Sequence, residues 1–122
     1  MSLREIQREI GEWSRRNFGD QVSKSTGQVL GSLSPLLGIQ EELGELCHVV
    51  LKRHQGIRGY DDDAKYQAER DDAMADIMVY LCDYASREGV DLEGVLTMTW
   101  NRVKSRDWTN RPQDANQHEV VT

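Results

Sequence analysis

Two segments of the sequence carry acidic side chains at helical spacing. On a helix with about 100° per residue, the members of each set share one face. If the two faces converge, at least four carboxylates meet in one pocket, and their repulsion is tolerable only around a cation. Carboxylate oxygens on rigid helices suit Mg²⁺ or Mn²⁺ better than zinc. The two sets are Glu41, Glu42 and Glu45, and Glu69, Asp72 and Asp76.

Asp76 is a single acid within an apolar stretch. Residues 73–82 read Ala-Met-Ala-Asp-Ile-Met-Val-Tyr-Leu-Cys, which is apolar on nearly every side of a helix. A buried carboxylate without a partner costs several kcal/mol, so this setting favours a paired charge or a metal ion. Glu45 lies in a weaker version of the same setting. The alternative is that the acids of both helices simply face water.

The pattern of apolar residues predicts an all-α fold, a bundle of four to five helices. The expected helices span residues 2–17, 34–54, 63–87 and 91 to 104 or 106. Ser34 is the expected N-cap of the second helix, with Pro35 at its first position. Residues 21–33 are rich in Ser, Thr and Gly and predict a loop. Residues 1–108 form the predicted domain, and residues 109–122 are expected to form a flexible C-terminal tail.

Composition limits the partners of the chain. Its 122 residues fit one domain, and the net charge of −6 argues against a polynucleotide surface. The hydrophobic share of 38% is low for a monomer of this size and favours a homodimer or homotetramer. Cys47 and Cys82 are interpreted as small buried residues. No apolar run approaches the roughly 18 residues of a membrane span, so we expect no membrane partner and a cytoplasmic location.

The acidic segments resemble the paired motifs of a known family. Residues 41–53 read EELGELCHVVLKR and residues 72–81 read DAMADIMVYL. Together they are similar to the two acidic motifs of the MazG-like all-α nucleotide pyrophosphohydrolases. The likeness extends to WSRRNFG at 13–19 and TWNRVKSRDW at 99–108, and so covers most of residues 1–108.

The resemblance implies hydrolysis of a nucleoside triphosphate to the monophosphate and pyrophosphate, with Mg²⁺ as the cofactor and Mn²⁺ as a substitute. The second motif departs from the commoner pattern, because Ala73 replaces an acid and Asp72 lies one residue earlier. This Asp-Ala-x-x-Asp form looks like that of a phage and bacterial branch of the family, and Asp72 still shares a helix face with Asp76. The implied metal ligands are Glu42, Glu45, Asp72 and Asp76.

Further residues are assigned roles around these ligands. Glu41, beside the ligand pair, is the candidate catalytic residue that positions or deprotonates the attacking water. A base could stack on Trp13, Tyr80, Trp100 or Trp108, of which Trp108 is favoured because a residue near the chain end could close over a pocket. The candidates for binding phosphate oxygens are Lys52, Arg53, Lys104 and Arg106.

Two other functions stay open from the sequence. The chain could be a non-catalytic helical interaction module whose acids face solvent or a partner. The spacing Glu45-x-x-His48 is also typical of di-iron carboxylate bundles, although a second copy of that motif is missing from the chain.

Overall fold

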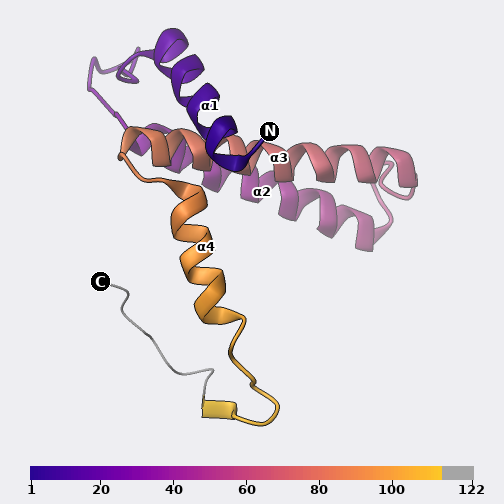
Figure 1. The fold of residues 1–122 in the computed structure, drawn as a ribbon. Coiled ribbons are helices and arrows are strands. Elements are labelled where there is room, and N and C mark those ends of the chain that lie inside the picture. The colour runs from indigo at the N-terminus through magenta and orange to yellow at the C-terminus, as the bar shows by residue number, and fades with distance from the viewer. Residues whose placement is uncertain (114–122) are drawn as a thin grey trace. The chain divides into compact units, whose positions relative to one another are not determined.

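The computed structural model describes residues 1–113 and contains four helices in that range (Figure 1). The only β pairing among those residues is an isolated antiparallel bridge between Val22 and Val29, in the predicted loop. The prediction of an all-α fold is therefore confirmed. The helices are α1 (Leu3–Phe18), α2 (Leu33–Gln55), α3 (Asp63–Arg87) and α4 (Leu92–Val103).

The start of α2 differs from the prediction. Ser32 occupies the N-cap position, so the expectation that Ser34 caps the helix is wrong. Pro35 is the third residue of α2, where a missing N–H costs little because the first turn has no intrahelical acceptor for it. The Ser34 hydroxyl instead donates to Gln21 Oε1 at 3.2 Å, which ties the preceding loop to the helix.

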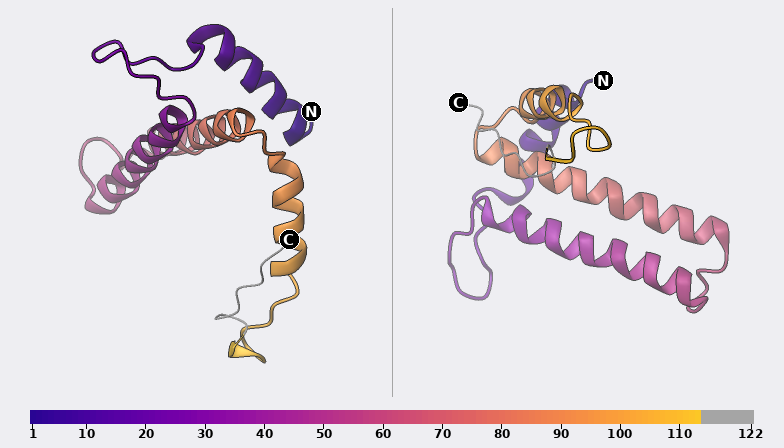
Figure 2. Two further views of the ribbon diagram at one scale, coloured as in Figure 1. Left: turned by 90° about the vertical axis from the view of Figure 1, so that its left-hand side faces the viewer. Right: turned by 90° about the horizontal axis from the view of Figure 1, so that it is seen from below.

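Helices α2 and α3 form an antiparallel hairpin, as the views in Figures 1 and 2 agree. The connection at 56–62 begins with Gly56 at a left-handed φ of 67°, which ends α2. At its far end, the Asp62 side chain accepts from the Ala64 N–H and caps α3. Because the connection is short, the acidic segment of α2 lies opposite the acidic segment of α3.

Gly38 allows α2 and α3 to approach closely. A Cβ added there would lie 2.6 Å from the Tyr80 ring, whereas one added at Gly44 of the same helix would meet nothing within 4 Å. We expect Gly38→Ala to destabilise the protein by about 1–3 kcal/mol through overpacking. The matched control Gly44→Ala should be neutral or stabilise by up to about 1 kcal/mol, because alanine is the better helix former. Urea unfolding measures both, and equal effects would contradict the close packing at Gly38.

A buried polar network joins α1 to α3. The Ser14 hydroxyl donates to Asp83 Oδ2 at 2.8 Å, and Arg87 Nε donates to Asp83 Oδ1 at 2.9 Å. Arg87 also donates to Ser14 Oγ at 2.9 Å and to the Gly19 carbonyl at 2.8 Å. The Arg87 and Asp83 side chains are only 9% and 8% exposed, so this pair is largely removed from water. The network therefore fixes the C-terminal half of α1 and its Gly19 cap against α3.

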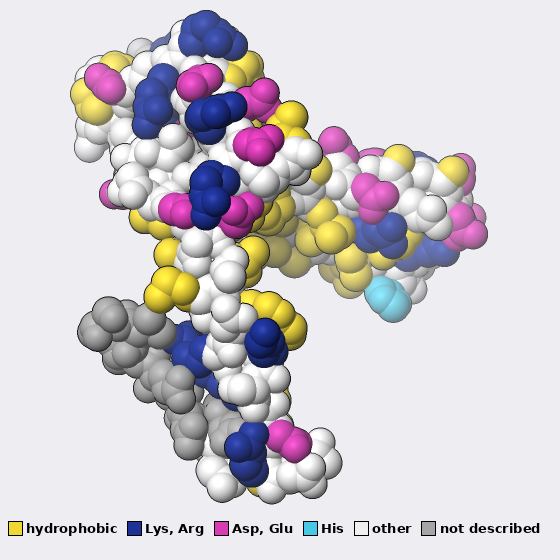
Figure 3. All heavy atoms as spheres, in the orientation of Figure 1, with side chains coloured by type: hydrophobic (Ala, Val, Ile, Leu, Met, Phe, Trp, Pro, Cys, Tyr) yellow, Lys and Arg dark blue, Asp and Glu magenta, His cyan; other side chains and the backbone are white. Residues whose placement is uncertain are grey.

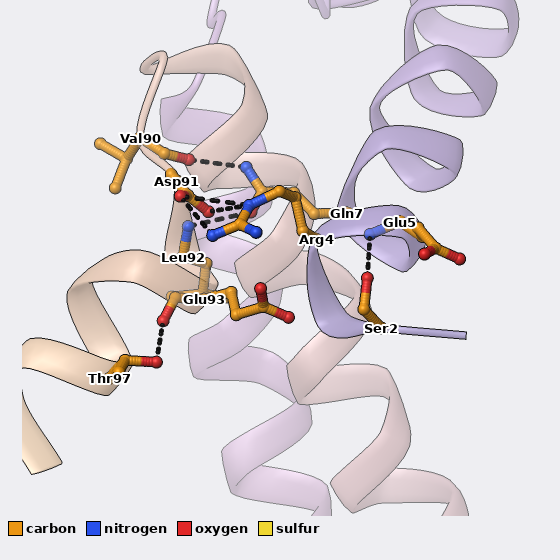
Figure 4. Close-up of polar contacts among 9 residues, drawn as sticks. All are labelled: Ser2, Arg4, Glu5, Gln7, Val90, Asp91, Leu92, Glu93 and Thr97. Carbon is orange, nitrogen blue, oxygen red and sulfur yellow. Dashed lines mark hydrogen bonds and ion pairs between the residues drawn. The ribbon is translucent and has the colours of Figure 1, made fainter.

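The N-terminal half of α1 is held by the segment that follows α3 (Figure 4). Arg4 pairs with Asp91 at 2.9 Å, and the Gln7 amide donates to the Val90 carbonyl at 2.6 Å. The Gln7 side-chain oxygen accepts from the Leu92 N–H at 3.0 Å. Polar contacts thus anchor α1 to α3 and to the segment that follows it.

The chain divides into two compact units, Met1–Leu92 and a C-terminal unit that begins at Glu93. In the C-terminal unit, Asp107 accepts hydrogen bonds from the backbone and side chain of Asn110, and Arg111 donates to the Ser105 carbonyl. Residues 109–113 of the predicted tail are therefore turned back on residues 105–107. The rest of that tail, residues 114–122, lies outside the described residues.

Many large apolar side chains of the hairpin are exposed (Figure 3). Leu51 is 53% and Met74 52% exposed, while the buried apolar residues include Val49 and Cys82. The prediction of burial is confirmed for Cys82 and wrong for Cys47, which is exposed on α2 among other apolar side chains. Within residues 1–113, no helix has the length and apolar character that crossing a membrane requires.

Candidate functional site

Five carboxylates from α2 and α3 line one pocket of about 250 Å³. Val49 and Ala73, both buried, form its apolar part. The methyl group of Ala73 contributes to the wall between the two helices. All four acids predicted as metal ligands are brought together, with one further acid beside them: Glu42, Glu45, Glu69, Asp72 and Asp76.

The acids of this pocket disfavour one another's charge. The pKa of Glu42 is raised above its ordinary value of 4.5, first by partial burial and then by the carboxylates of four neighbours. These neighbours are Asp76, Glu41, Glu45 and Asp72, in decreasing order of effect. A cation placed among them would remove this repulsion.

The donor atoms of the pocket fit a hard divalent cation, since all of them are carboxylate oxygens. In the part of the chain that the structure describes, no three Asp, Glu, His or Cys side chains are grouped closely enough to hold a metal ion as they stand. The pocket therefore gathers suitable ligands without a ready-made coordination shell. Coordination requires these side chains to rotate toward a common point from the rigid helices that carry them.

Asp76 is less buried than its apolar context predicts. Its side chain is half-buried, and Met74, Met78 and Val79 around it are exposed. The apolar stretch therefore forms an open face of the hairpin in addition to part of the core. Glu41 is exposed and lines neither the acidic pocket nor the pocket next to it, although its charge reaches Glu42.

Glu69 and Tyr60 were not assigned roles from the sequence. The hydroxyl of Tyr60, which is buried in the α2–α3 connection, donates to Glu69 Oε1 at 3.0 Å. This hydrogen bond is the main reason that the pKa of Tyr60 is raised. Glu69 shares the helix face of Asp72 and Asp76, so its spacing indicated a role, but nothing in the sequence pairs it with Tyr60. The bond restrains one carboxylate at the edge of the acidic pocket.

A second pocket of about 360 Å³ adjoins the acidic one, because Glu42 and Asp76 line both. Half of its lining side chains are aromatic or aliphatic, and the other half are polar, with three carboxylates among them. The rings of Trp13 and Phe18 pack edge to face with their centroids 5.4 Å apart. They share the pocket with Tyr80, whose pKa is raised by burial and then by nearby carboxylates. Tyr80 therefore stays a neutral phenol at physiological pH.

The buried network of α1 and α3 supports this second pocket. Asp83 lines it, and Ser14, which donates to Asp83, follows Trp13 directly in the chain. Arg87 holds the carbonyl of Gly19, the residue after Phe18. The same hydrogen bonds thus hold the backbone next to each of the two aromatic residues.

The predicted phosphate-binding residues are spread over the chain. Lys52 donates to Gln55 at 3.0 Å near the end of α2. Arg53 donates to the Tyr60 carbonyl at 2.7 Å and pairs with Asp63, so it holds the α2–α3 connection in place. Contact between Arg53 and a phosphate requires these bonds to break. The other two, Lys104 and Arg106, belong to the C-terminal unit, as does Trp108, the favoured candidate for base stacking.

His48 does not join Glu45 in the acidic pocket. Its ring packs edge to face on Tyr60, with the centroids 6.2 Å apart, while Glu45 lines the pocket. The two residues of the Glu-x-x-His spacing therefore have different surroundings within this chain.

No protein-family model matches the chain, and neither a curated protein nor a solved structure matches it. The family resemblance therefore rests on the motif residues themselves.

Glu42→Gln is expected to raise the melting temperature of the metal-free protein at pH 7. Because folding raises the pKa of Glu42, the folded chain holds this proton to a higher pH than the unfolded chain does, so stability falls as pH rises from 4.5 through the raised pKa. The glutamine removes this penalty and should leave stability at pH 4 unchanged. Melting curves at pH 7 and pH 4 measure the effect of the substitution. The control is Glu12→Gln, which makes the same change at an exposed position of α1. An equal effect of the two variants at pH 7 would show that Glu42 is not under strain from its neighbours.

Proposed function

We propose that the chain is a Mg²⁺-dependent nucleoside triphosphate pyrophosphohydrolase of the MazG-like kind. The observation that supports this most strongly is the adjacency of two pockets, one acidic and one aromatic, with Glu42 and Asp76 common to both. A nucleotide requires a cation near its phosphates and an apolar slot for its base, and the two pockets offer these side by side.

In the proposed reaction, water attacks the α-phosphorus and the bond to the bridging oxygen of the β-phosphate breaks, which releases pyrophosphate. A bound divalent ion supplies charge neutralisation for the phosphate oxygens and lowers the pKa of bound water. Its ligands in the proposal are Glu42, Glu45, Asp72 and Asp76. Glu41, one residue from Glu42, is proposed to orient or deprotonate the water. Full turnover by Glu41→Gln would exclude that role.

The aromatic pocket is proposed to hold the base. Trp13, Phe18 and Tyr80 offer ring surfaces for stacking, and a volume of about 360 Å³ lies within the usual range for small-molecule sites. This assignment differs from the sequence-based preference for Trp108. Trp13→Ala should therefore raise KM more than it lowers kcat, and Trp108→Ala should have the smaller effect on KM.

The test of the function is pyrophosphate release from a panel of ordinary, deoxy and damaged nucleoside triphosphates with Mg²⁺. Release by the wild-type chain that is lost on chelation and in Glu45→Gln supports the enzyme. No release from any nucleotide would favour the non-catalytic interaction module. Oxidase activity with iron retained through purification would favour the di-iron bundle instead.

We further propose that the exposed apolar face of α2 is covered by a second copy of the chain. A shallow depression on α2 is almost wholly apolar. Apolar patches of this kind on an otherwise charged chain are typical of protein–protein contacts. Its lining residues are Leu46, Cys47, Val50, Leu51 and His54. Light scattering should give at least a dimer for the wild type and a smaller species for Leu51→Lys. A wild-type monomer would contradict this proposal.

A further inference from the structure

Gln21 lines the aromatic pocket and has an unusual backbone conformation. Its φ is 59°, in the left-handed region that residues other than glycine seldom adopt. The conformation is held by two backbone hydrogen bonds, from the Gln21 N–H to the Phe18 carbonyl and from the Leu30 N–H to the Gln21 carbonyl, both 3.0 Å. Strain of this kind persists where the surroundings fix it, and it is often found at binding sites. Here a residue in this conformation lines the pocket.

One of the three carboxylates of this pocket, Asp83, is already engaged. Both carboxylate oxygens of Asp83 accept hydrogen bonds, from Ser14 and from Arg87. Glu42 and Asp76 also line the acidic pocket. Gln21 contributes an amide N–H donor to this pocket, beside the indole N–H of Trp13 and the hydroxyls of Tyr80 and Ser34.

Ser34 determines which end of the Gln21 amide is available. Its hydroxyl donates to Gln21 Oε1 at 3.2 Å, so the amide oxygen is directed toward α2. The amide NH₂ group can donate two hydrogen bonds, and it donates none to the residues that the structure describes. The pocket therefore offers a ligand a hydrogen-bond donor between aromatic walls.

We propose that Gln21, oriented by Ser34, selects nucleotides whose base carries a carbonyl group over those whose base carries an amino group at the same position. This proposed selectivity rests on the nucleotide site of the proposed function. A keto base such as uracil or hypoxanthine places an acceptor opposite the Gln21 NH₂ group. Cytosine or adenine places a second donor there, which leaves both groups unpaired.

Two pairs of substrates test this contact, UTP against CTP and ITP against ATP. Each pair exchanges a carbonyl for an amino group and, with it, an N–H donor for an acceptor at the neighbouring ring nitrogen, so the Gln21 and Ser34 variants identify the contribution of this contact. For the wild type we expect kcat/KM to favour the keto member by at least about 10-fold in both pairs. Gln21→Glu should lower or invert both ratios, since Ser34 keeps one carboxylate oxygen and the other becomes an acceptor. Ser34→Ala should move both ratios toward one by releasing the amide.

Two controls separate this effect from misfolding and from added charge. Gln21→Asn keeps a residue that tolerates positive φ but has a shorter side chain, so the fold should persist while the ratios fall toward one. Gln28→Glu adds the same charge at an exposed position of the same loop and should leave the ratios unchanged.

Binding of non-hydrolysable α,β-imido nucleotides, measured by calorimetry with Mg²⁺, gives the same ratios without turnover. If no triphosphate is hydrolysed, the proposed function fails and the ratio of binding constants alone decides the role of Gln21. Hydrolysis or binding with keto-to-amino ratios near one in the wild type, or ratios unmoved by Gln21→Glu, would overturn the role of Gln21 and leave the proposed function standing.

Discussion

Asp76→Asn is expected to lower kcat for pyrophosphate release by roughly 100-fold or more and to abolish the thermal stabilisation by Mg²⁺. Asp76 lines both pockets, so in the proposed site its carboxylate would hold the cation next to the pocket proposed for the base. Loss of one charged ligand weakens the hold on the ion and its effect on bound water. Steady-state kinetics across Mg²⁺ concentrations, together with melting curves, measure both effects.

The matched control for this variant is Asp71→Asn. Asp71 lies on the same helix but outside the pockets, where it pairs with Arg70 at 2.9 Å and is 65% exposed. This variant makes the same chemical change and should keep near-normal turnover. Equal losses in the two variants would point to a general effect on α3 and contradict a specific role of Asp76.

Arg87→Met is expected to destabilise the protein by about 3–5 kcal/mol, because it leaves the Asp83 carboxylate buried without its charged partner. It also removes the bonds that hold Ser14 and Gly19. Urea unfolding gives the free energy of unfolding.

The exposed pair of Arg4 and Asp91 provides the comparison for this variant. These side chains are 61% and 50% exposed, so Arg4→Met should cost no more than about 1 kcal/mol. The combination of Arg87→Met with Asp83→Leu and Ser14→Ala should recover much of the loss, because it replaces the whole network by apolar groups. A loss below about 1 kcal/mol for Arg87→Met alone would show that water reaches Asp83.

The helices could be predicted from local signals. The range 63–87 agrees with the observed α3, since Asp62 and Gly89 mark its two ends in the sequence. The N-cap of α2 was misplaced by two residues, because Ser32 and Ser34 are equally good local N-caps. In the structure both hydroxyls make tertiary contacts, Ser32 with Glu88 and Ser34 with Gln21, and no local pattern contains these.

The candidate site was predictable in part. Helical spacing alone groups the acids of each helix, and the hairpin brings the two groups together at one pocket. The aromatic pocket was harder to predict, because Trp13 and Phe18 lie on α1 and Tyr80 lies on α3. The two helices are joined by the Ser14–Asp83–Arg87 network, which no local sequence pattern reveals. Cys47 and Asp76 were expected to be buried from their apolar neighbours. Their exposure reflects a hairpin with an open apolar face, a property of the packing that the sequence pattern does not contain.

Anomalous diffraction from crystals grown with Mn²⁺ tests the proposed metal centre most directly. We expect an anomalous peak in the pocket between α2 and α3, bounded by carboxylate oxygens from both helices, with Glu45 and Asp76 among its ligands. Crystals in which Mn²⁺ leaves this pocket empty, with Glu45 and Asp76 directed separately into solvent, would contradict the proposed centre and the enzymatic function that depends on it.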